Sequence, residues 1–308
     1  MNATRTRLPD GRWHFQHGPI DLVIGADGDA RAVETAHEAA WNRFESVLAE
    51  LVAELPALRR AVRDGACPLE GVIARRMWHA CFPFRDRFVT PMAAVAGSVA
   101  QEIVAAYGRD GVTRAFVNNG GDIALHLAPG ASFRVGVVAD LALHVPEGRH
   151  AGLPPDADFD VEAAMPVRGI ATSGWRGRSQ SLGIADSVTV LAATAAEADA
   201  AATMIANAVN VADPRIVRLP ARDVRDDSDL GDIPVTVDVP SLEPALVDEA
   251  IASGLERARG IARSGLVVAA LIVCQGRSAT LAGAPLRPHS APGATAASIE
   301  TRAFARVA

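Results

Sequence analysis

The chain has 308 residues, a formal net charge of −6 and hydrophobic residues at 49% of its positions. This composition allows a buried core and excludes general disorder, and the acidic balance gives no basis for nucleic-acid binding through counterion release. All 30 basic residues are Arg, because the sequence contains no Lys. A Lys Schiff base, a Lys general base and a phosphate-binding Lys are therefore excluded, and any cationic contact to a phosphate falls to Arg.

The same inventory limits compartment and covalent chemistry. Cys67, Cys81 and Cys274 are too few and too widely spaced for a disulfide framework or a zinc site. The N-terminal residues lack the apolar stretch of a signal peptide, and the longest apolar run, 266–274, is too short to span a bilayer as a helix. These features predict a soluble cytoplasmic protein without a membrane partner.

Up to residue 108 the chain predicts a hairpin followed by helices. Strand-like residues 12–16 and 20–24 flank a turn at His17-Gly18-Pro19. A long helix is expected between Asp29, which suits an N-cap, and Pro56, which ends or kinks it. Its buried face is marked by apolar residues three and four positions apart, namely Trp41, Phe44, Leu48, Leu51 and Leu55. A shorter helix is expected near 69–80, and another over 90–108, between a Thr90 cap and a Gly108 stop.

The remainder of the chain alternates strands, loops and helices. Strands are expected at 113–118, 122–127, 132–138, 169–173, 187–192, 235–239 and 266–274, helices at 195–209 and about 243–264, and surface loops at 140–165 and 175–185. Hairpins mixed with long helices favour an α+β fold of antiparallel sheet covered by helices. We expect a single domain over 1–283, with a division into lobes at about 1–110 and 111–283 as the alternative, and a flexible tail over 284–308 that is rich in Pro, Ala and Ser.

The stretch AFVNNGGDIALHL, residues 115–127, places two amides, two glycines and a carboxylate between two apolar runs. Two glycines between strands are typical of a tight hairpin turn, which is the favoured reading of this motif alone. Glycine backbones also allow a ligand to approach closely, and Asp122 can bind a hydroxyl, a ring N–H or a metal.

Two further motifs each have a structural and a chemical interpretation. ATSG at 171–174 runs into WRGRSQS, where hydroxyls, glycines and Arg side chains suit either a solvated loop or a pyrophosphate cradle. Asp199 and Thr203 are four residues apart on an expected helix, so they share a face and offer two oxygens to a hard cation such as Mg²⁺. The alternative, which is favoured for this motif alone, is that Asp199 only complements the dipole near the helix start.

The order of these three signals resembles the FAD:protein FMN transferases of the ApbE type. NNGGDI, then GIATSG, then SVTVLA, then EADAAAT follow one another, and the spacing within 169–203 is the most specific part. The whole chain is more similar to a prokaryotic branch of that superfamily, through HGPIDLVI, the PMAAVAG helix and SLGIADSVTVLA. The resemblance implies an α+β, T-fold-like architecture with a ligand cleft between two lobes.

Residue roles implied by the resemblance are carried over position by position. Asp199 and Thr203 match magnesium ligands, and the backbone carbonyl of Ala93 matches a third; Asp199 is also the candidate catalytic residue. The flavin nucleotide is expected to lie against residues of the first two motifs, namely Asn119, Gly120, Gly121, Asp122, Thr172, Ser173, Gly174 and Arg178. The implied cofactors are FAD and Mg²⁺, and the implied partners are the flavin nucleotide and an acceptor protein; a homodimer is left open.

The sequence departs from the family pattern in ways that bear on activity. A Lys-Gly pair and a later Asp of the family are replaced by Ala96-Gly97 and Gln101, and a His-x-x-Asp-Pro stretch is replaced by SLGIAD. The groups that would handle charge or protons at the pyrophosphate are therefore missing. Three functions remain open: a Mg²⁺-dependent FMN transferase or FAD-cleaving enzyme, an accessory protein that binds a flavin nucleotide without transferring it, and a scaffold that has lost the ligand.

Overall fold

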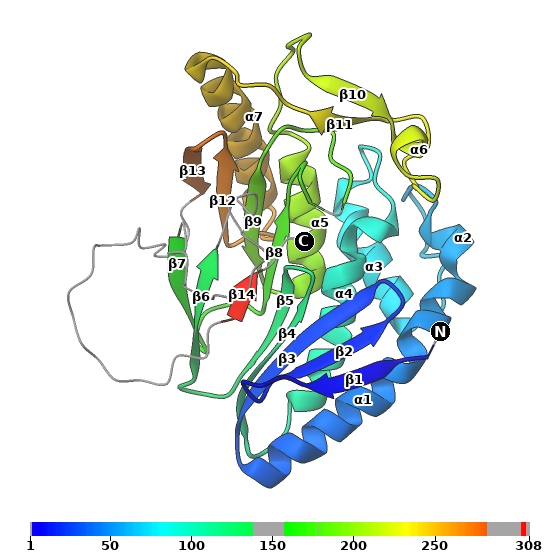
Figure 1. Ribbon diagram of the computed structural model, residues 1–308, viewed down its shortest axis with the longest axis vertical. Helices are drawn as coiled ribbons and strands as arrows, with labels where there is room; N and C mark the ends of the chain where they lie inside the picture. The colour runs from blue at the N-terminus through cyan, green and yellow to red at the C-terminus, as the bar shows by residue number, and fades with distance from the viewer. Residues whose placement is uncertain (1, 138–156, 178, 282–302, 306–308) are drawn as a thin grey trace, which may run out of the picture.

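A computed structural model describes residues 2–137, 157–177, 179–281 and 303–305. Its centre is a nine-stranded antiparallel sheet in the order β1-β2-β3-β4-β5-β8-β9-β12-β13 (Figure 1). The strands are β1 (Thr4–Arg7), β2 (Trp13–His17), β3 (Ile20–Gly28), β4 (Val112–Asn119), β5 (Asp122–Leu127), β8 (Gly169–Ser173), β9 (Ser187–Ala192), β12 (Ala269–Cys274) and β13 (Arg277–Leu281).

Two small sheets accompany the large one. Strands β6 (Ser132–Val137) and β7 (Ala157–Glu162) form an antiparallel hairpin, and β14 (Ala303–Ala305) pairs parallel to β6. Strands β10 (Val217–Pro220) and β11 (Pro234–Asp238) form a separate antiparallel ribbon.

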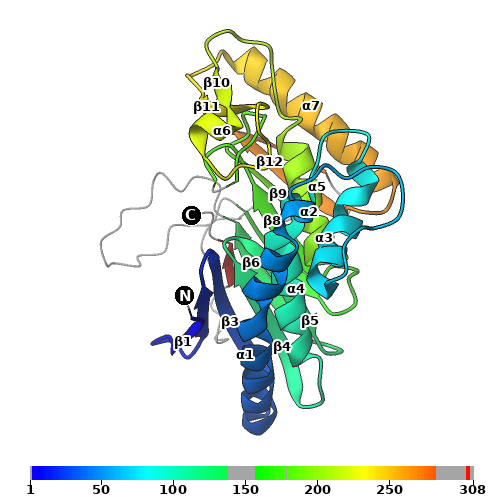
Figure 2. The same cartoon turned by 90° about the vertical axis from the view of Figure 1, so that its right-hand side faces the viewer.

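The longer helices cover one face of the large sheet (Figure 2). The α-helices are α1 (Ala30–Ala53), α2 (Leu55–Leu58), α3 (Val72–Cys81), α4 (Val95–Val104), α5 (Ala195–Ala206), α6 (Ala221–Val224) and α7 (Pro244–Arg263). Short 3₁₀ turns are η1 (Phe82–Phe84), η2 (Pro91–Ala94) and η3 (Ala105–Tyr107). The predicted α+β class, with antiparallel sheet covered by helices, is confirmed.

Apolar alternation along the central strands divides the core between the two faces of the sheet. On β4, Ala115 and Val117 join the core beneath the helices, whereas Phe116 points to the other face. There Phe116 meets Phe133 of β6 edge to face, with ring centroids 5.9 Å apart. The small β6–β7 sheet therefore closes the face of the large sheet that the helices leave open.

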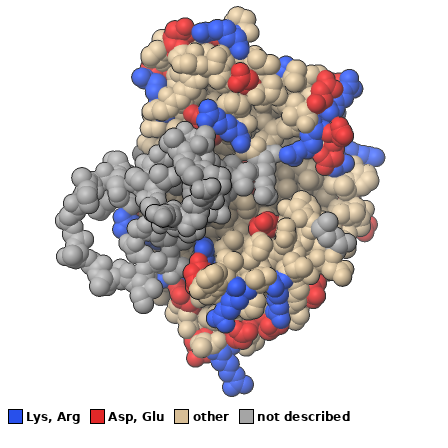
Figure 3. Space-filling model, viewed as in Figure 1, with Lys and Arg blue, Asp and Glu red and all other residues tan. Residues whose placement is uncertain are grey.

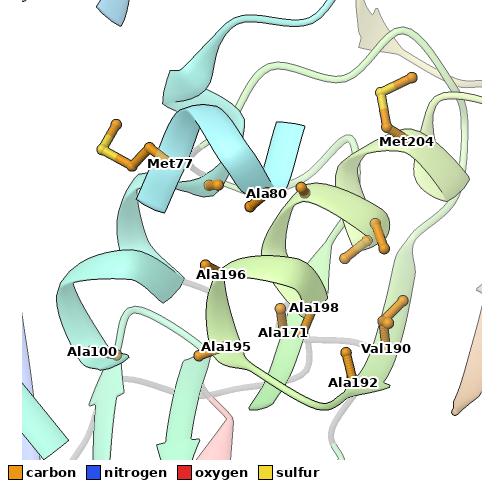
Figure 4. Close-up of a cluster of buried hydrophobic side chains, with 14 of the residues drawn as sticks. Met77, Ala80, Ala100, Ala171, Val190, Ala192, Ala195, Ala196, Ala198 and Met204 are labelled. Atoms are coloured by element: carbon orange, nitrogen blue, oxygen red, sulfur yellow. The ribbon is translucent and has the colours of Figure 1, made fainter. Parts of the chain in front are cut away.

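Helix α5 lies at the centre of the helical layer. Its alanines pack against α3, α4 and the strands β8 and β9, in a cluster that includes Met77, Ala100, Ala171 and Val190 (Figure 4). Gly169 of β8 touches the start of this helix so closely that a Cβ would lie 2.2 Å from the Ala195 backbone nitrogen. Small residues on both sides thus bring α5 down onto the sheet.

Most elements agree with the sequence prediction, and the differences have local causes. Asp29 caps α1 by accepting from the N–H groups of Arg31 and Ala32, and Thr90 caps η2. The helix predicted over 90–108 is divided into η2, α4 and η3. The loop predicted over 140–165 is wrong over 157–162, where β7 lies: buried Phe159 and Val161 alternate with polar residues that had favoured a loop.

Four other strands were not predicted. β1, β10 and β13 have only exposed or partly exposed side chains and so lack a strong apolar pattern, and β14 has only three residues. Within the predicted tail, Ala303–Ala305 form β14.

No helix among the described residues combines the length and apolar character needed to cross a bilayer. Among the described residues visible in Figure 3, acidic and basic side chains are interspersed, without a large patch of one sign.

The two glycines Gly169 and Gly260 should respond in opposite ways to replacement by Ala. Gly169→Ala is expected to destabilise the fold by about 1–3 kcal/mol, because the new methyl group would overlap the backbone at the start of α5. Gly260→Ala, on α7, should stabilise it by about 0.5–1 kcal/mol, since the nearest atom is the Arg263 side chain at 3.8 Å. Urea unfolding measures both, and equal effects would contradict this packing of β8 against α5.

Candidate functional site

The NNGGD stretch forms the two-residue turn between β4 and β5. Asn119 pairs with Asp122 across the hairpin, and Gly120 and Gly121 occupy the turn with φ of +65° and +113°. Both positions are left-handed, which is the geometry that favours Gly-Gly in a tight hairpin. A Cβ on Gly120 would meet no atom within 4 Å, so the outer side of the turn is open.

The two asparagines fix this turn to its surroundings. The Gly121 N–H donates to the Asn118 side-chain oxygen over 2.8 Å, and the Asn119 side-chain amide donates to the Ala96 carbonyl over 3.1 Å. Side chains alternate between the two faces along a strand, and Val117, two residues before Asn119, belongs to the core beneath the helices. Asn119 therefore lies on the helix-facing side of β4. Its side chain therefore binds the turn to the start of α4 and is committed to a structural contact.

Asp122 begins β5 on the helix-facing side of the sheet, because residues two apart on a strand share a face and Ala124 belongs to the core beneath the helices. It is buried, and one carboxylate oxygen accepts from the Thr172 backbone N–H over 3.2 Å. The turn thus directs a carboxylate inward, toward the layer occupied by α5.

Asp199 lies on α5 and faces the N-terminal end of α4. Its carboxylate accepts from the Gly97 N–H over 2.9 Å, and the Ala96 N–H gives further backbone stabilisation. This contact requires a glycine, because a Cβ on residue 97 would lie 2.2 Å from the Ala195 carbonyl oxygen and 2.9 Å from the Asp199 Cβ. Asp199 therefore acts as an N-cap supplied to α4 by a different helix.

The two carboxylates form an electrostatically coupled pair. Burial raises the pKa of Asp122 well above its ordinary value, and the charge of Asp199 raises it further against the opposing Thr172 hydrogen bond. Burial raises the pKa of Asp199 to about 7, despite the hydrogen bonds from Gly97 and Ala96. The two carboxylates repel each other when both are ionised, so either protonation of one of them or a bound cation is favoured.

Thr203 and Ser173 extend this site along α5. Gly169 of β8 is level with Ala195, and the antiparallel order of β8 and β9 makes β8 run in the same direction as α5. The four residues from Gly169 to Ser173 cover about 13 Å along β8, and the eight residues from Ala195 to Thr203 cover about 12 Å along α5. Ser173 is therefore expected to be level with Thr203. Both residues are partly exposed, and neither side chain has a hydrogen-bond partner among the described residues.

The three residues of the TSG motif have three different environments. The Thr172 hydroxyl pairs with that of Thr189 at 2.9 Å on the face of the sheet opposite the helices, so only its N–H reaches Asp122. Ser173 takes the helix-facing side by alternation. Gly174 is required by packing, because a Cβ there would lie 2.3 Å from the Asp186 carbonyl oxygen.

The loop after TSG carries an aromatic side chain and a cation. The Arg176 guanidinium carbon lies 5.0 Å from the Trp175 ring centroid, and its Nε lies 3.7 Å from an Asp186 oxygen. Asp186 also accepts from the Gln275 N–H over 2.5 Å, which gives it a structural role in holding the β12–β13 turn. Arg178, a predicted nucleotide contact, lies outside the described residues.

The available donors suit a hard cation better than a soft one. In the described part of the chain no three His, Cys, Asp or Glu side chains gather into a metal cluster. The oxygens of Asp122, Asp199 and Thr203 are the donor type that Mg²⁺ prefers. Ala93, the predicted carbonyl ligand, belongs to η2, which packs against α5.

Two surface hollows lie away from these residues. One, of about 370 Å³, is lined by Thr113, Arg114 and residues 128–132, and the other, of about 390 Å³, lies beside Phe84 and Arg257. Neither contains a residue of the carboxylate pair or of the TSG loop. The chemistry of the site, not the size of a hollow, therefore identifies the candidate.

Backbone groups of α4 are the part of the site that sequence reasoning missed. Ala96 supplies a carbonyl to Asn119, and Gly97 supplies an N–H to Asp199. Gln101, one turn further, accepts from the Ala196 N–H over 3.3 Å and so caps the start of α5. The small residues of PMAAVAG were the available signal, since they indicate close approach of another backbone without naming it.

Comparisons with known proteins identify relatives over most of the chain. Residues 5–280 match the model of a family described as AbpE bacteria. The chain is 31% identical to the UPF0280 protein of Methanoregula boonei over 240 residues, which cover 70% of this chain and 95% of the relative. It is 34% identical to a UPF0280 protein of Methanopyrus kandleri, with coverage of 67% and 78%, and 38% identical to that of Methanosphaerula palustris, with coverage of 64% and 77%. These names state no ligand or reaction.

Removing the Asp199 charge should stabilise the metal-free protein at alkaline pH. The folded-state pKa of Asp199 is raised, so its stabilising protonated form is lost as pH rises from about 4 through about 7. In EDTA at pH 8, Asp199→Asn should therefore be more stable than the wild type by on the order of 2 kcal/mol, and the difference should vanish near pH 4. Denaturant unfolding at both pH values measures it.

Glu197→Gln is the matched control for this prediction. Glu197 lies on the same helix but bonds Thr194 at the cap, so its replacement should not reproduce the pH-dependent gain. If Asp199→Asn is less stable than the wild type at pH 8, the ionised Asp199 carboxylate does not destabilise the metal-free fold, and the electrostatic description of the pair is wrong.

Proposed function

Because this chain belongs to the family described as AbpE bacteria, we propose that it binds FAD together with Mg²⁺ at the Asp122–Asp199 pair. The observation that carries the proposal is the pair itself. The buried Asp122 and the partly exposed Asp199 come from distant parts of the chain, and both have raised pKa values. No cationic side chain is among the groups that shift these pKa values. A bound divalent cation would offset this repulsion.

The donor set fits magnesium. Asp122, Asp199 and Thr203 would contribute side-chain oxygens, and the resemblance adds the Ala93 carbonyl. Mg²⁺ bound there would polarise a phosphoryl oxygen and offset negative charge that develops at phosphorus. The Gly97 N–H would keep the Asp199 carboxylate oriented, which is the role of a hydrogen-bonded neighbour to a metal ligand.

The surroundings of the pair support a nucleotide rather than a bare metal. The Ser173 hydroxyl, which has no hydrogen-bond partner among the described residues, is level with Thr203 by the strand and helix rise given above. The loop that follows brings Trp175 and Arg176. Arg176 supplies a charge for a phosphate in a chain that lacks Lys, and the open side of Gly120 leaves room for a ligand at the β4–β5 turn. Trp175 offers an aromatic surface for a flat ring.

Cleavage of bound FAD at its pyrophosphate would release AMP. The oxygen that attacks the FMN-side phosphorus would come from a hydroxyl of an acceptor protein, giving a covalent FMN adduct, or from water, giving free FMN. Asp199 is the candidate catalytic residue because it would touch the metal at this phosphate. Its position on a packed helix, capped onto α4, would hold the site in one geometry.

A second candidate function is a non-catalytic flavin-nucleotide binding protein. The observation that favours it is the absence of a proton-handling partner, because no described His contributes to the charge environment of either carboxylate and the chain has no Lys. Such a protein would retain FAD without releasing AMP.

Asp199→Asn should abolish Mg²⁺-dependent AMP release from FAD. We expect a loss on the order of 100-fold or more, because the amide cannot provide the charge that holds the cation. The measurement is chromatographic quantification of AMP with and without Mg²⁺, with intact-mass analysis for transferred FMN. Glu197→Gln on the same helix should retain wild-type turnover.

Thermal unfolding with FAD and Mg²⁺ separates the two functions. A ligand at about one hundred times its Kd stabilises the folded state by about 2.7 kcal/mol. Stabilisation without AMP release would favour the non-catalytic function. A wild-type protein that neither gains stability nor releases AMP would refute flavin-nucleotide binding.

A further inference from the structure

Residues 225–233 connect two segments of the chain, which we call the two walls. One wall is η2, which precedes α4, and the other is formed by residues 179–185, which follow TSG. The segment is closed at its base by hydrogen bonds from the Ala221 N–H to the Ile233 carbonyl over 3.0 Å and from the Arg222 N–H to the Gly231 carbonyl over 2.9 Å. Its middle residues reach both walls.

Asp229 makes the contact to η2. The Thr90 hydroxyl donates to the Asp229 carboxylate and also accepts from the Met92 N–H over 3.2 Å. Thr90 is buried, so its hydroxyl depends on protein partners for its hydrogen bonds. Asp229 thereby fixes the N-cap of η2, which carries Ala93 and leads directly into the Gly97 N–H that binds Asp199.

Ser228 makes the contact to the other wall. Its hydroxyl donates to the Gln180 side-chain oxygen over 2.5 Å and accepts from the Leu230 N–H over 3.3 Å. Gln180 in turn donates to the Ala221 carbonyl over 2.9 Å, and the neighbouring Ser181 carbonyl accepts from the Thr236 N–H over 2.8 Å. The loop after TSG is thus bound to the same segment that holds Thr90.

We propose that residues 225–233 are a tether that sets the spacing between η2 and the loop after TSG, with Asp229 and Ser228 as positioning residues at its two contacts. The metal-binding part of this inference rests on the proposed function, because it concerns the same site. The path from Asp229 is continuous: it holds Thr90, Thr90 starts η2, η2 leads into α4, and α4 presents the Gly97 N–H to Asp199. Neither Asp229 nor Ser228 touches the metal in this arrangement.

The polarity of the contact requires a hydrogen-bond acceptor at position 229. The Thr90 hydroxyl donates its one hydrogen to Asp229, which leaves its lone pairs for the Met92 N–H. An ionised acceptor strengthens this bond relative to a neutral one. The amide oxygen of Asp229→Asn can accept the same hydrogen, whereas the methyl group of Asp229→Ala cannot. Comparing the two variants therefore distinguishes a role of Asp229 in holding Thr90 from a role of its negative charge.

Four variants test the tether, with Mg²⁺ alone as the probe. Asp229→Ala should weaken Mg²⁺ affinity by about tenfold, measured by isothermal titration, and Asp229→Asn should stay close to wild type because it still accepts from Thr90. Hydrogen exchange of the metal-free protein should accelerate about tenfold at amides 92–97 in Asp229→Ala, since that change frees the cap. Ser228→Ala should accelerate exchange in 179–185 instead.

Asp227→Ala is the matched control, because Asp227 belongs to the same segment but is exposed, and its one ion pair among the described residues is with Arg59 at 3.5 Å. Amides of α7 report global unfolding and should be unchanged in all four proteins. The tether is refuted if Asp229→Ala matches Asp227→Ala in exchange at 92–97. Wild-type protein that fails to bind Mg²⁺ would instead refute the proposed metal site, and the exchange measurement would still decide the tether.

Discussion

The close approach of α4 and α5 at Gly97 is the constraint on which the site depends. A side chain at this position would overlap the Ala195 carbonyl, so glycine alone allows the N-terminal end of α4 to reach the flank of α5. The Gly97 N–H then finds its acceptor in Asp199, and the Asn119 side chain joins the β4–β5 turn to the same end of α4. The packing of α4 against α5 therefore also determines the orientation of the Asp199 carboxylate.

The environment of Asp199 contains two opposing effects. The N-terminal end of α4 stabilises its anionic form through two backbone N–H groups, whereas burial destabilises it. Burial prevails, because the pKa is raised, and the neighbouring Asp122 shares the same condition. A fold selected for stability alone would replace one of the two by a neutral residue. Keeping both is understandable if a cation binds between them, and strain of this kind is typical of functional sites.

Local patterns allowed much of the fold to be predicted from the sequence, but the contacts within the site were not readable in the same way. Helical spacing and caps located α1, and strand alternation located β4, β5 and β9, since these signals act over a few residues. The alternation of Phe159 and Val161 in β7 was present but masked by acidic neighbours. The meeting of Asp122 and Asp199 joins residues far apart in the chain, so it followed only from the family resemblance.

The orientation of side chains also changes how the two glycine-containing motifs should be interpreted. In TSG, strand alternation sends the Thr172 hydroxyl to Thr189 on the far face, so a ligand beside α5 would meet Ser173 and the backbone instead. In NNGGD, the left-handed glycines fix the hairpin register, and that register places Asp122 on the face of α5. A one-residue shift would turn the carboxylate to the opposite face. A tight turn and the proposed ligand site are therefore compatible, because the turn directs the Asp122 carboxylate toward α5.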